Sequence, residues 1–275
     1  MALADLHVHT VASDGTWQPV NLVRAAKRLG LLAIAVTDHD TTAGVAETQA
    51  VGRAVGLPVI AGVELSTRVG GKEIHVIGLG IDPHDTHLTS VITHMRKSRA
   101  KRAELILQRL DEIGLPIPRD RLYEVAGGGV IGRPHVARVM VEAKYVDSVD
   151  EAFKKYLGDG CPAYVTRDYL SPATVISTIH KAGGIAVVAH PGLMDSQLDL
   201  RGLVNTGFDA LEAYHSRHDQ EQTEVFLQLA RENDLLVSGG SDCHGTSVGR
   251  PQLLGSVGVD RPRLARLMTA CQQYR

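Results

Sequence analysis

The chain alternates short apolar runs with longer helical stretches, and this alternation restricts the fold more than any other feature. Seven runs have the length and composition of buried strands: 3–9, 31–37, 58–65, 73–79, 185–189, 208–213 and 235–238. Helical patterns follow most of them, at 19–29, 42–55, 172–182 and 220–233. Such a β–α alternation predicts an α/β fold with a mainly parallel sheet or barrel.

The link between the third and fourth runs differs from the others. It comprises only residues 66–72 and contains Gly70 and Gly71. A link that short makes a hairpin, because a parallel crossover needs a dozen or more residues. We therefore expect one antiparallel pair in a barrel of seven strands, slightly short of the usual eight.

Residues 100–165 interrupt the alternation. Helical patterns without an intervening strand cover 89–113, 134–143 and 149–157. We interpret this stretch as a helical insertion that forms a substrate-binding cap. The expected barrel is then built from two separate parts of the chain, 1–99 and 166–275.

A basic run lies where the barrel gives way to the insertion. It contains Arg96, Lys97, Arg99, Lys101 and Arg102. The simpler interpretation is a solvated helix face. The alternative is a basic rim that attracts phosphorylated substrates.

Composition excludes several classes of protein. A formal net charge of −2 is too acidic for a protein that coats nucleic acid, although small anionic substrates stay open. The three cysteines follow no disulfide or zinc-finger spacing, which favours a reducing compartment. Neither a signal peptide nor an apolar run of the roughly 18 residues that span a membrane is apparent. We expect a cytoplasmic protein with no membrane contact and no stable protein partner.

Histidine and acidic residues recur at the ends of the predicted strands. His7 and His9 alternate along the first strand, so both imidazoles face the same side. The strand ends converge on one mouth of a parallel barrel, whereas random placement would scatter such residues. We therefore predict a metal site. Its other expected ligands are Asp14, His39, Glu64, His75, His190, Asp242 and His244.

Three neighbours of these residues have other expected roles. Cys243 lies between two predicted ligands, so on an extended segment its side chain faces away and packs in the core. Asp38 and Asp40 flank His39, and we expect them to support the ligands or cap the backbone.

Six sequence blocks stand out as a set. They are DLHVHTVASDG, AVTDHDT, GVELS, EIHVIGLG, VVAHPG and GGSDCHG. In content and order they resemble the polymerase-and-histidinol-phosphatase (PHP) family of metal-dependent phosphoesterases. The resemblance spans nearly the whole chain outside the insertion. It implies the family's distorted seven-stranded (β/α)7 barrel, here with a helical insertion, and a metal-dependent phosphatase.

The resemblance also implies three divalent metal ions per chain. The first would be held by His7, His9, Glu64 and Asp242. Glu64 would bridge to a second, held also by His75 and His190. The third would be held by Asp14, His39 and His244. Mixed imidazole and carboxylate ligands suit borderline metals; Mn²⁺ is expected, with Fe²⁺ or Zn²⁺ as alternatives.

The chemistry expected of such a site is hydrolysis. Clustered cations can lower the pKa of a bound water from 15.7 to about 7, so that a metal-bound hydroxide attacks the phosphoryl group. The residues expected to act at the reacting centre are Glu64, His190, Asp242 and His215. His215 ends the sixth strand and is placed on the leaving-group side.

The insertion carries a second candidate site in the block IGRPHVAR. Gly132 and Pro134 predict a turn into a helix, with the proline at its first position. Arg133 and His135 would lie at the helix N-terminus, which favours anions, and arginine can grip a phosphate through two hydrogen bonds. The alternative is an ordinary helix start with exposed charge.

The same block suggests a substrate. GRPHVAR resembles a PHP branch that acts on 3′,5′-bisphosphorylated nucleosides and on short 5′-phosphorylated oligonucleotides. The resemblance implies that the 3′-phosphate is cleaved at the metals while Arg133 and His135 hold the other phosphate. A phosphorylated nucleotide or a short oligonucleotide is then the expected partner. Arg250 is a weaker candidate, with surface placement as its alternative.

Three other functions stay open. Histidinol phosphate phosphatase shares the metal blocks, but the insertion argues against it. An amidohydrolase would use a similar barrel, but no candidate for a carbamylated lysine ends a strand. A non-catalytic PHP module typically loses ligands, whereas this chain matches every position.

Overall fold

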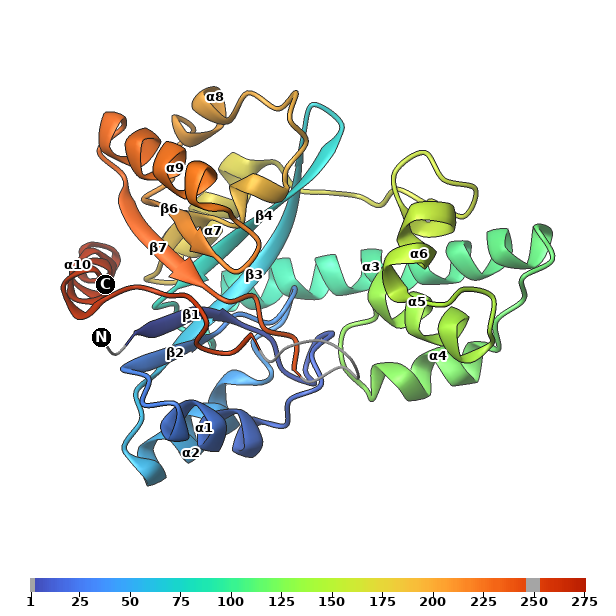
Figure 1. Cartoon of the computed structure of the whole chain (residues 1–275), viewed down its shortest axis with the longest axis horizontal. Helices are drawn as coiled ribbons and strands as arrows, with labels where there is room; N and C mark the ends of the chain where they lie inside the picture. Colours follow the sequence, from blue (N-terminus) through green and yellow to red (C-terminus); the bar gives the residue numbers. More distant parts are fainter. Residues whose placement is uncertain (1–2, 246–252) are drawn as a thin grey trace.

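The protein is described by a computed structural model that covers residues 3–245 and 253–275, so the candidate Arg250 lies outside the described residues. Seven strands form one sheet in sequence order, curled into a nearly closed barrel (Figure 1). They are β1 (Ala4–Val8), β2 (Ala33–Val36), β3 (Val59–Val69), β4 (Lys72–Leu79), β5 (Ile185–Val188), β6 (Ala210–His215) and β7 (Leu236–Gly240). The predicted seven-stranded barrel is confirmed.

The predicted hairpin between the third and fourth strands is confirmed as well. β4 runs antiparallel to both β3 and β5, while the remaining neighbours are parallel. β3 continues to Val69, four residues beyond the predicted end. The hairpin therefore projects past the mouth of the barrel and forms a wall beside it.

The barrel closes between β1 and the segment after β7. The backbone N–H of His9 donates to the carbonyl oxygen of Cys243 at 3.0 Å, and that of Asp242 donates to the carbonyl of His7 at 2.9 Å. Gly240 permits this approach, because a Cβ there would lie 2.4 Å from the Cβ and backbone nitrogen of His7. The closure thus brings together three of the predicted metal ligands.

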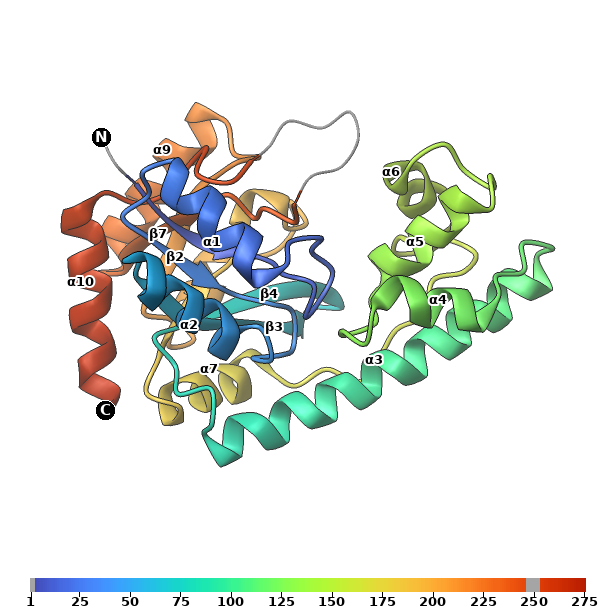
Figure 2. The ribbon, with the colours of Figure 1, turned by 90° about the horizontal axis from the view of Figure 1, so that it is seen from below.

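Helices cover the outside of the barrel (Figures 1 and 2). They are α1 (Pro19–Arg28), α2 (Val45–Val55), α7 (Pro172–Lys181), α9 (Gln220–Glu232) and α10 (Arg261–Cys271), with the short α8 (Leu200–Val204), η2 (Pro191–Leu193) and η3 (Gln272–Tyr274). Helices α8 and α10 were not predicted, although each begins after an aspartate that caps it. The side chain of Asp199 accepts a hydrogen bond from the backbone N–H of Gly202, and that of Asp260 accepts one from the N–H of Arg263.

The insertion is entirely helical. It contains α4 (Arg119–Ala126), α5 (Arg133–Glu142) and α6 (Val149–Ala152), which continues as a π-helical turn η1 (Phe153–Leu157). Helices α4 and α5 lie beside the C-terminal half of the long α3 (Thr86–Glu112), and α6 lies on the far side of α5, all on the side of the barrel opposite the chain ends (Figure 2). They share a hydrophobic cluster that includes Ile106, Leu110, Leu122, Val136 and Met140.

Helix α3 connects this unit to the barrel. Its first turns contribute Leu88, Ile92 and Met95 to the barrel core. The predicted boundary at residues 99 and 100 therefore falls inside one continuous helix, and the division into domains stays a prediction. Helix α4 was not predicted, and α5 begins at Arg133, so Pro134 is its second residue. No helix in the described ranges has the length and apolar character to cross a membrane.

The closure suggests a test of stability. We expect Gly240→Ala to lower the free energy of unfolding by about 3 kcal/mol, because the new Cβ forces the backbones of β7 and β1 apart. Gly70→Ala is the control, since only its left-handed backbone is strained, with a φ of 55° and no atom near its Cβ. Gly70→Ala should lower the free energy of unfolding by about 1 kcal/mol. Urea denaturation of both variants measures the difference; equal losses would contradict the close approach.

Candidate metal centre

The nine predicted ligands meet at the mouth of the barrel. His7 lies in β1, Glu64 in β3 and His75 in β4, while the other six lie in the turns that follow β1, β2, β5 and β7. Glu64 and His75 are not strand-terminal, because the β3–β4 hairpin continues beyond them. Three groups of donor atoms can be distinguished within this cluster.

The first group surrounds one position at the barrel axis. The Nε2 atoms of His7 and His9 lie 3.4 and 3.1 Å from Oδ1 of Asp242. The same two nitrogens lie 3.4 and 3.3 Å from Oε2 of Glu64. Ligand atoms bound at about 2.0–2.2 Å from one divalent ion stand roughly 3–3.5 Å apart, so this spacing fits a metal.

The second group uses the other oxygen of Glu64. Its Oε1 lies 2.9 Å from Nδ1 of His75 and 3.0 Å from Nε2 of His190. The two imidazole nitrogens are 3.3 Å apart. The two oxygens of Glu64 therefore face different groups, as a bridging carboxylate requires.

The third group is looser. Asp14 lies 3.3 Å from Nε2 of His244 through Oδ1 and 3.8 Å from Nε2 of His39 through Oδ2. The Nδ1 atom of His39 lies 2.9 Å from Oε2 of Glu64. His39 thus stands between the third group and the other two. His9, Asp14, His39 and His244 together form one set of convergent donor atoms.

Buried donor atoms in the cluster lack hydrogen bonds. Among the described residues, no partner is found for Nε2 of His7 and His9, Nδ1 of His39 or Oε2 of Glu64. Each buried polar atom left unpaired costs about 1–3 kcal/mol. Divalent cations would satisfy all of them, so the residues present fit a metal cluster.

Two of the ligands have unusual backbone conformations. His190 has a φ of 28° and Asp242 a φ of 54°, in the left-handed region that non-glycine residues rarely adopt. Each such residue costs about 1–3 kcal/mol and persists only where the surrounding structure enforces it. At these positions the strain turns the two side chains into the mouth.

Glu212 supports two ligands and was missed by the sequence reasoning. It is fully buried, lies 3.0 Å from Nδ1 of His7, and accepts a hydrogen bond of 2.7 Å from the backbone N–H of His190. A carboxylate behind a ligating imidazole fixes the orientation of the ring and makes it a better donor. The available signal was an acidic residue inside the apolar run of β6.

The neighbours of the ligands have the supporting positions expected of them. Asp38 accepts hydrogen bonds from the N–H of Thr10 and the hydroxyl of Ser13, which fixes the turn that carries Asp14. Asp40 pairs with Arg99 and Arg167. Cys243 is buried in the hydrophobic core.

When cations are absent, the surrounding carboxylates favour protons on several ligand imidazoles, whereas burial lowers the pKa of His39. Burial alone would lower the pKa of His9, but hydrogen bonds with Asp242 and Glu64 raise it to about 10. Burial is likewise outweighed at His75, where Glu64 and Glu73 raise the pKa to about 9. Because a ligating imidazole must be neutral, metal ions and protons compete for these residues.

The remaining predicted residues lie around the cluster. His215 is buried, and its Nε2 lies 3.5 Å from Oδ2 of Asp242. Arg133 lies 2.6 Å from Oε2 of Glu73, two residues before the ligand His75. His135 accepts a hydrogen bond of 3.0 Å from the N–H of Gly132 through Nδ1. Burial lowers the pKa of His135 to about 4, so its imidazole is neutral.

A cavity of about 580 Å³ adjoins the metal cluster. Asp14, Asp242 and His244 line it from the barrel, Ser216 and Arg217 from the turn after β6, and Pro134 and Arg138 from the insertion. Arg138 also donates a hydrogen bond to the backbone carbonyl of Asp14. A ligand of nucleotide size would touch both the cluster and the insertion.

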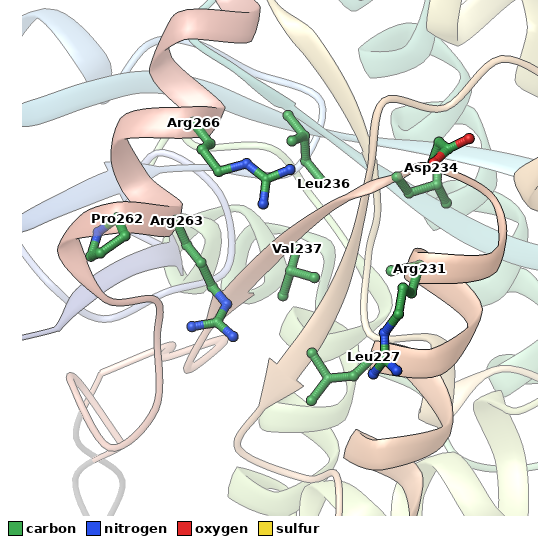
Figure 3. Close-up of a pocket in the computed structure, with 10 residues that line it drawn as sticks. Leu227, Arg231, Asp234, Leu236, Val237, Pro262, Arg263 and Arg266 are labelled. Carbon is green, nitrogen blue, oxygen red and sulfur yellow. The ribbon is translucent and has the colours of Figure 1, made fainter.

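A second hollow of about 490 Å³ lies elsewhere, where β7 begins between α9 and α10 (Figure 3). Its walls include Leu227, Leu236, Val237, Arg231, Arg263 and Arg266. None of the described residues that line it is a predicted metal ligand. The cavity beside the metal cluster is therefore part of the candidate active site, although the predicted substrate-binding residues Arg133 and His135 do not line it.

Comparison with known proteins decides the family. A family model described as "PHP domain" matches residues 5–158, which is more than half of the chain. The chain belongs to the PHP family. It is 37% identical over 245 residues to a 5′-3′ exoribonuclease of Haemophilus influenzae, covering 87% of this chain and 89% of that protein.

Two further proteins are similar to most of this chain. It is 34% identical over 259 residues to a 3′,5′-nucleoside bisphosphate phosphatase of Chromobacterium violaceum, covering 90% of each. The crystal structure of a metal-dependent phosphoesterase from Bifidobacterium adolescentis superposes with a TM-score of 0.87 at 32% identity, covering 97% and 95% of the two chains. The predicted class of enzyme, a metal-dependent phosphoric ester hydrolase, is confirmed.

The role of Glu212 can be tested through metal affinity. We expect Glu212→Gln to weaken metal binding by about 10–100-fold, because two ligands lose the carboxylate that orients them. Asp209→Asn is the matched control; that carboxylate lies at the other end of β6 and binds His180 and Tyr274. Calorimetric titration with Mn²⁺ measures the metal affinity of both variants. An unchanged Mn²⁺ affinity of Glu212→Gln would show that the Glu212 carboxylate does not orient the two ligands.

Proton competition gives a second prediction. Mn²⁺ binding to metal-free protein near neutral pH should release protons, because His9 and His75 are protonated there, with pKa values of about 10 and 9. Metal affinity should therefore increase as the pH rises, and it should level off only when His7 and His244, whose pKa values are raised as well, are also neutral. Calorimetry in two buffers of different ionisation enthalpy counts the protons. A pH-independent affinity would contradict this electrostatic account.

Proposed function

We propose that this PHP protein removes the 3′-phosphate from 3′,5′-nucleoside bisphosphates and also acts on short 5′-phosphorylated oligonucleotides. The observation that carries the proposal is the position of Arg133. Its guanidinium binds Glu73 at 2.6 Å, and the other oxygen of Glu73 lies 3.7 Å from Nε2 of His75. A group that recognises phosphate therefore lies one side chain away from the metal cluster. The names of the two relatives support a nucleotide substrate.

We further propose three divalent ions, of which Mn²⁺ is the expected metal and Fe²⁺ or Zn²⁺ the alternatives. The three donor groups and their mixture of imidazoles and carboxylates support this assignment. When bound, such ions polarise phosphoryl oxygens and lower the pKa of water to about 7.

The protein's own residues have distinct roles in this scheme. Glu64 joins the first two donor groups through its two oxygens. Asp242 orients its Oδ1 toward His7 and His9, while its Oδ2 lies 3.5 Å from His215. We propose that His215 exchanges a proton at the reacting group, on the leaving-group side. His190 completes the second group, held through its backbone by Glu212.

The insertion selects the substrate in this scheme. Arg133 holds the phosphate that is not cleaved, and the binding energy of this remote group orients the reacting one. His135 was expected to hold this phosphate as well, but it is neutral and buried, so we propose instead that it fixes the start of α5, from which Arg133 projects. Residues 100–165 would then serve as a cap on a cytoplasmic enzyme with no membrane contact and no stable protein partner.

The test compares two substrates in two proteins. Arg133→Ala should lower kcat/KM for adenosine 3′,5′-bisphosphate. The loss should correspond to about 2–4 kcal/mol of transition-state stabilisation, the cost of breaking a charge-paired contact. Hydrolysis of p-nitrophenyl phosphate should change far less, because it has no second phosphate. Product analysis of the bisphosphate reaction should show adenosine 5′-monophosphate.

The control is Arg121→Ala, which removes an exposed arginine from α4 in the same insertion. It should leave both substrates unaffected. An equal loss on both substrates in Arg133→Ala would place Arg133 in the reacting centre or the fold. No loss on either would deprive the nucleotide proposal of its physical basis.

A further inference from the structure

The cavity beside the metal cluster adjoins only part of it. Its described lining includes Asp14, Asp242 and His244, which belong to the first and third donor groups. Among the residues that the structure describes, no histidine of the second group lines it, and neither does Glu73, the partner of Arg133. The cavity and Arg133 therefore meet the metal cluster through different ligands.

A substrate held by both Arg133 and the metals has a fixed direction. In the proposed function Arg133 binds the 5′-phosphate and the metals bind the 3′-phosphate, so the first nucleoside lies between them. The cavity takes no part in this arrangement. A group that enters it is attached to the far side of the reacting phosphoryl group, and in an oligonucleotide this group is the second nucleotide.

The reaction is the same with or without a second nucleotide. Water adds its oxygen to the phosphorus, the bond between the phosphorus and the 3′-oxygen breaks, and the 3′-oxygen takes up a proton. The products are a 5′-mononucleotide and either inorganic phosphate or a shorter oligonucleotide that again begins with a 5′-phosphate. A site for the second nucleotide therefore changes the choice of substrate without changing the chemistry.

The size and the apolar lining of the cavity suit a nucleotide. Its volume of about 580 Å³ lies within the roughly 300–1,000 Å³ of ligand pockets. The apolar side chains that line it are Pro134, Val141, Val149 and Leu253. No aromatic side chain is found among its described lining residues, so a base would be held by apolar contact and not by stacking.

Two arginines give the cavity positive charge. Arg217 follows β6 and Arg138 lies in α5, so they line it from the barrel and from the insertion. Of the acidic residues in the described lining, only Asp147 is not a predicted metal ligand. With divalent ions bound to Asp14 and Asp242, positive charge predominates in the cavity, and positive charge attracts a phosphate backbone.

The two arginines differ in their contacts. Arg138 donates a hydrogen bond to the backbone carbonyl of Asp14, so it also fixes a metal ligand. The guanidinium of the exposed Arg217 has no ion pair or hydrogen bond within the described parts of the chain. Its backbone N–H donates to Nδ1 of His215 at 3.2 Å, which places the residue beside the reacting centre. The guanidinium of Arg217 is therefore available to a ligand.

We infer that this cavity receives the nucleotide that follows the scissile phosphate, and that Arg217 binds the next phosphate of an oligonucleotide. The inference rests on the proposed function and extends it, since neither the cavity nor Arg217 has a role in that scheme. A nucleoside bisphosphate uses only the metals and Arg133. Oligonucleotides also fill the cavity, so the cavity decides how well the protein acts on a chain compared with a mononucleotide.

The kinetic test compares adenosine 3′,5′-bisphosphate with the 5′-phosphorylated di- and triadenylates pApA and pApApA. Only pApApA has a phosphate beyond the one that is cleaved first. In Mn²⁺-loaded protein, initial release of adenosine 5′-monophosphate gives kcat/KM for each substrate. Arg217→Ala should lower the ratio of pApApA to bisphosphate about fivefold, the effect of one exposed ion pair. The ratio of pApA to bisphosphate should change less than about twofold.

Two further variants separate charge from space. Arg217→Glu should lower the ratio of pApApA to bisphosphate about 20-fold or more, because like charges repel. Val141→Phe places a larger side chain in the cavity from α5. It should lower the ratios for both oligonucleotides about fivefold or more, because the second nucleotide loses its space. Arg231→Ala is the matched control; it removes an exposed arginine of α9 that lines the other hollow, and it should change neither ratio.

Inhibition gives a measurement that does not require cleavage of a nucleotide. The oligonucleotide pApApA should inhibit hydrolysis of p-nitrophenyl phosphate competitively, with an inhibition constant about fivefold weaker in Arg217→Ala. The slope of the logarithm of this constant against log[KCl] should be smaller by about 0.7 in Arg217→Ala, the contribution of one phosphate contact of a single strand. Inhibition by adenosine 5′-monophosphate should be equal in Arg217→Ala and the wild type.

The outcomes separate the two proposals. Equal losses on the bisphosphate and on pApApA would place Arg217 at the reacting centre and overturn the inference. Unchanged ratios in Arg217→Glu would overturn it as well, since Arg217 would then meet no phosphate, and unchanged ratios in Val141→Phe would place the second nucleotide elsewhere. If the wild type cleaves no nucleotide but pApApA inhibits it through Arg217, the cavity binds oligonucleotides and the proposed function is wrong.

Discussion

The buried carboxylate of Glu64 is the contact on which the rest of the site depends. Its two oxygens lie 2.9–3.4 Å from nitrogens of five histidines, which come from β1, from the turns after β1, β2 and β5, and from β4. Burying so many metal-ligand atoms without hydrogen bonds destabilises the fold unless cations bind between them. The closure of β1 on the segment after β7 and the strained backbones of His190 and Asp242 serve to assemble this arrangement.

The β3–β4 hairpin connects the chemistry to the choice of substrate. It carries Glu64 and His75, which belong to the metal cluster, and Glu73, which binds Arg133 of the insertion. Ser66 and His75 stand opposite each other in the hairpin, and Ser66 accepts a hydrogen bond from Arg99. A rigid antiparallel pair thus fixes the position of Arg133 relative to the metal ligands.

Much of this could be predicted from the sequence because it follows from local periodicity. The strands are short apolar runs, and the ligands follow them at positions where parallel strands converge. Glu212 was missed because a carboxylate inside an apolar strand acquires its partners, His7 and His190, only through folding. Helix α4 was missed for a related reason: its residues 119–126 are mostly polar, and its two buried side chains, Leu122 and Ala126, are too few for an amphipathic pattern.

The sequence by itself determined the seven strands, their hairpin, the helical insertion and the set of residues able to hold metals. Only the tertiary structure decided what the basic residues do. Positions 99 and 102 lie on one face of a helix by spacing alone, but spacing does not say whether that face meets water. Packing against the β3–β4 hairpin buries these two arginines beside Arg133 and Arg167, from distant parts of the chain. Which carboxylates a buried arginine meets is decided by the assembled structure, and no linear pattern records it.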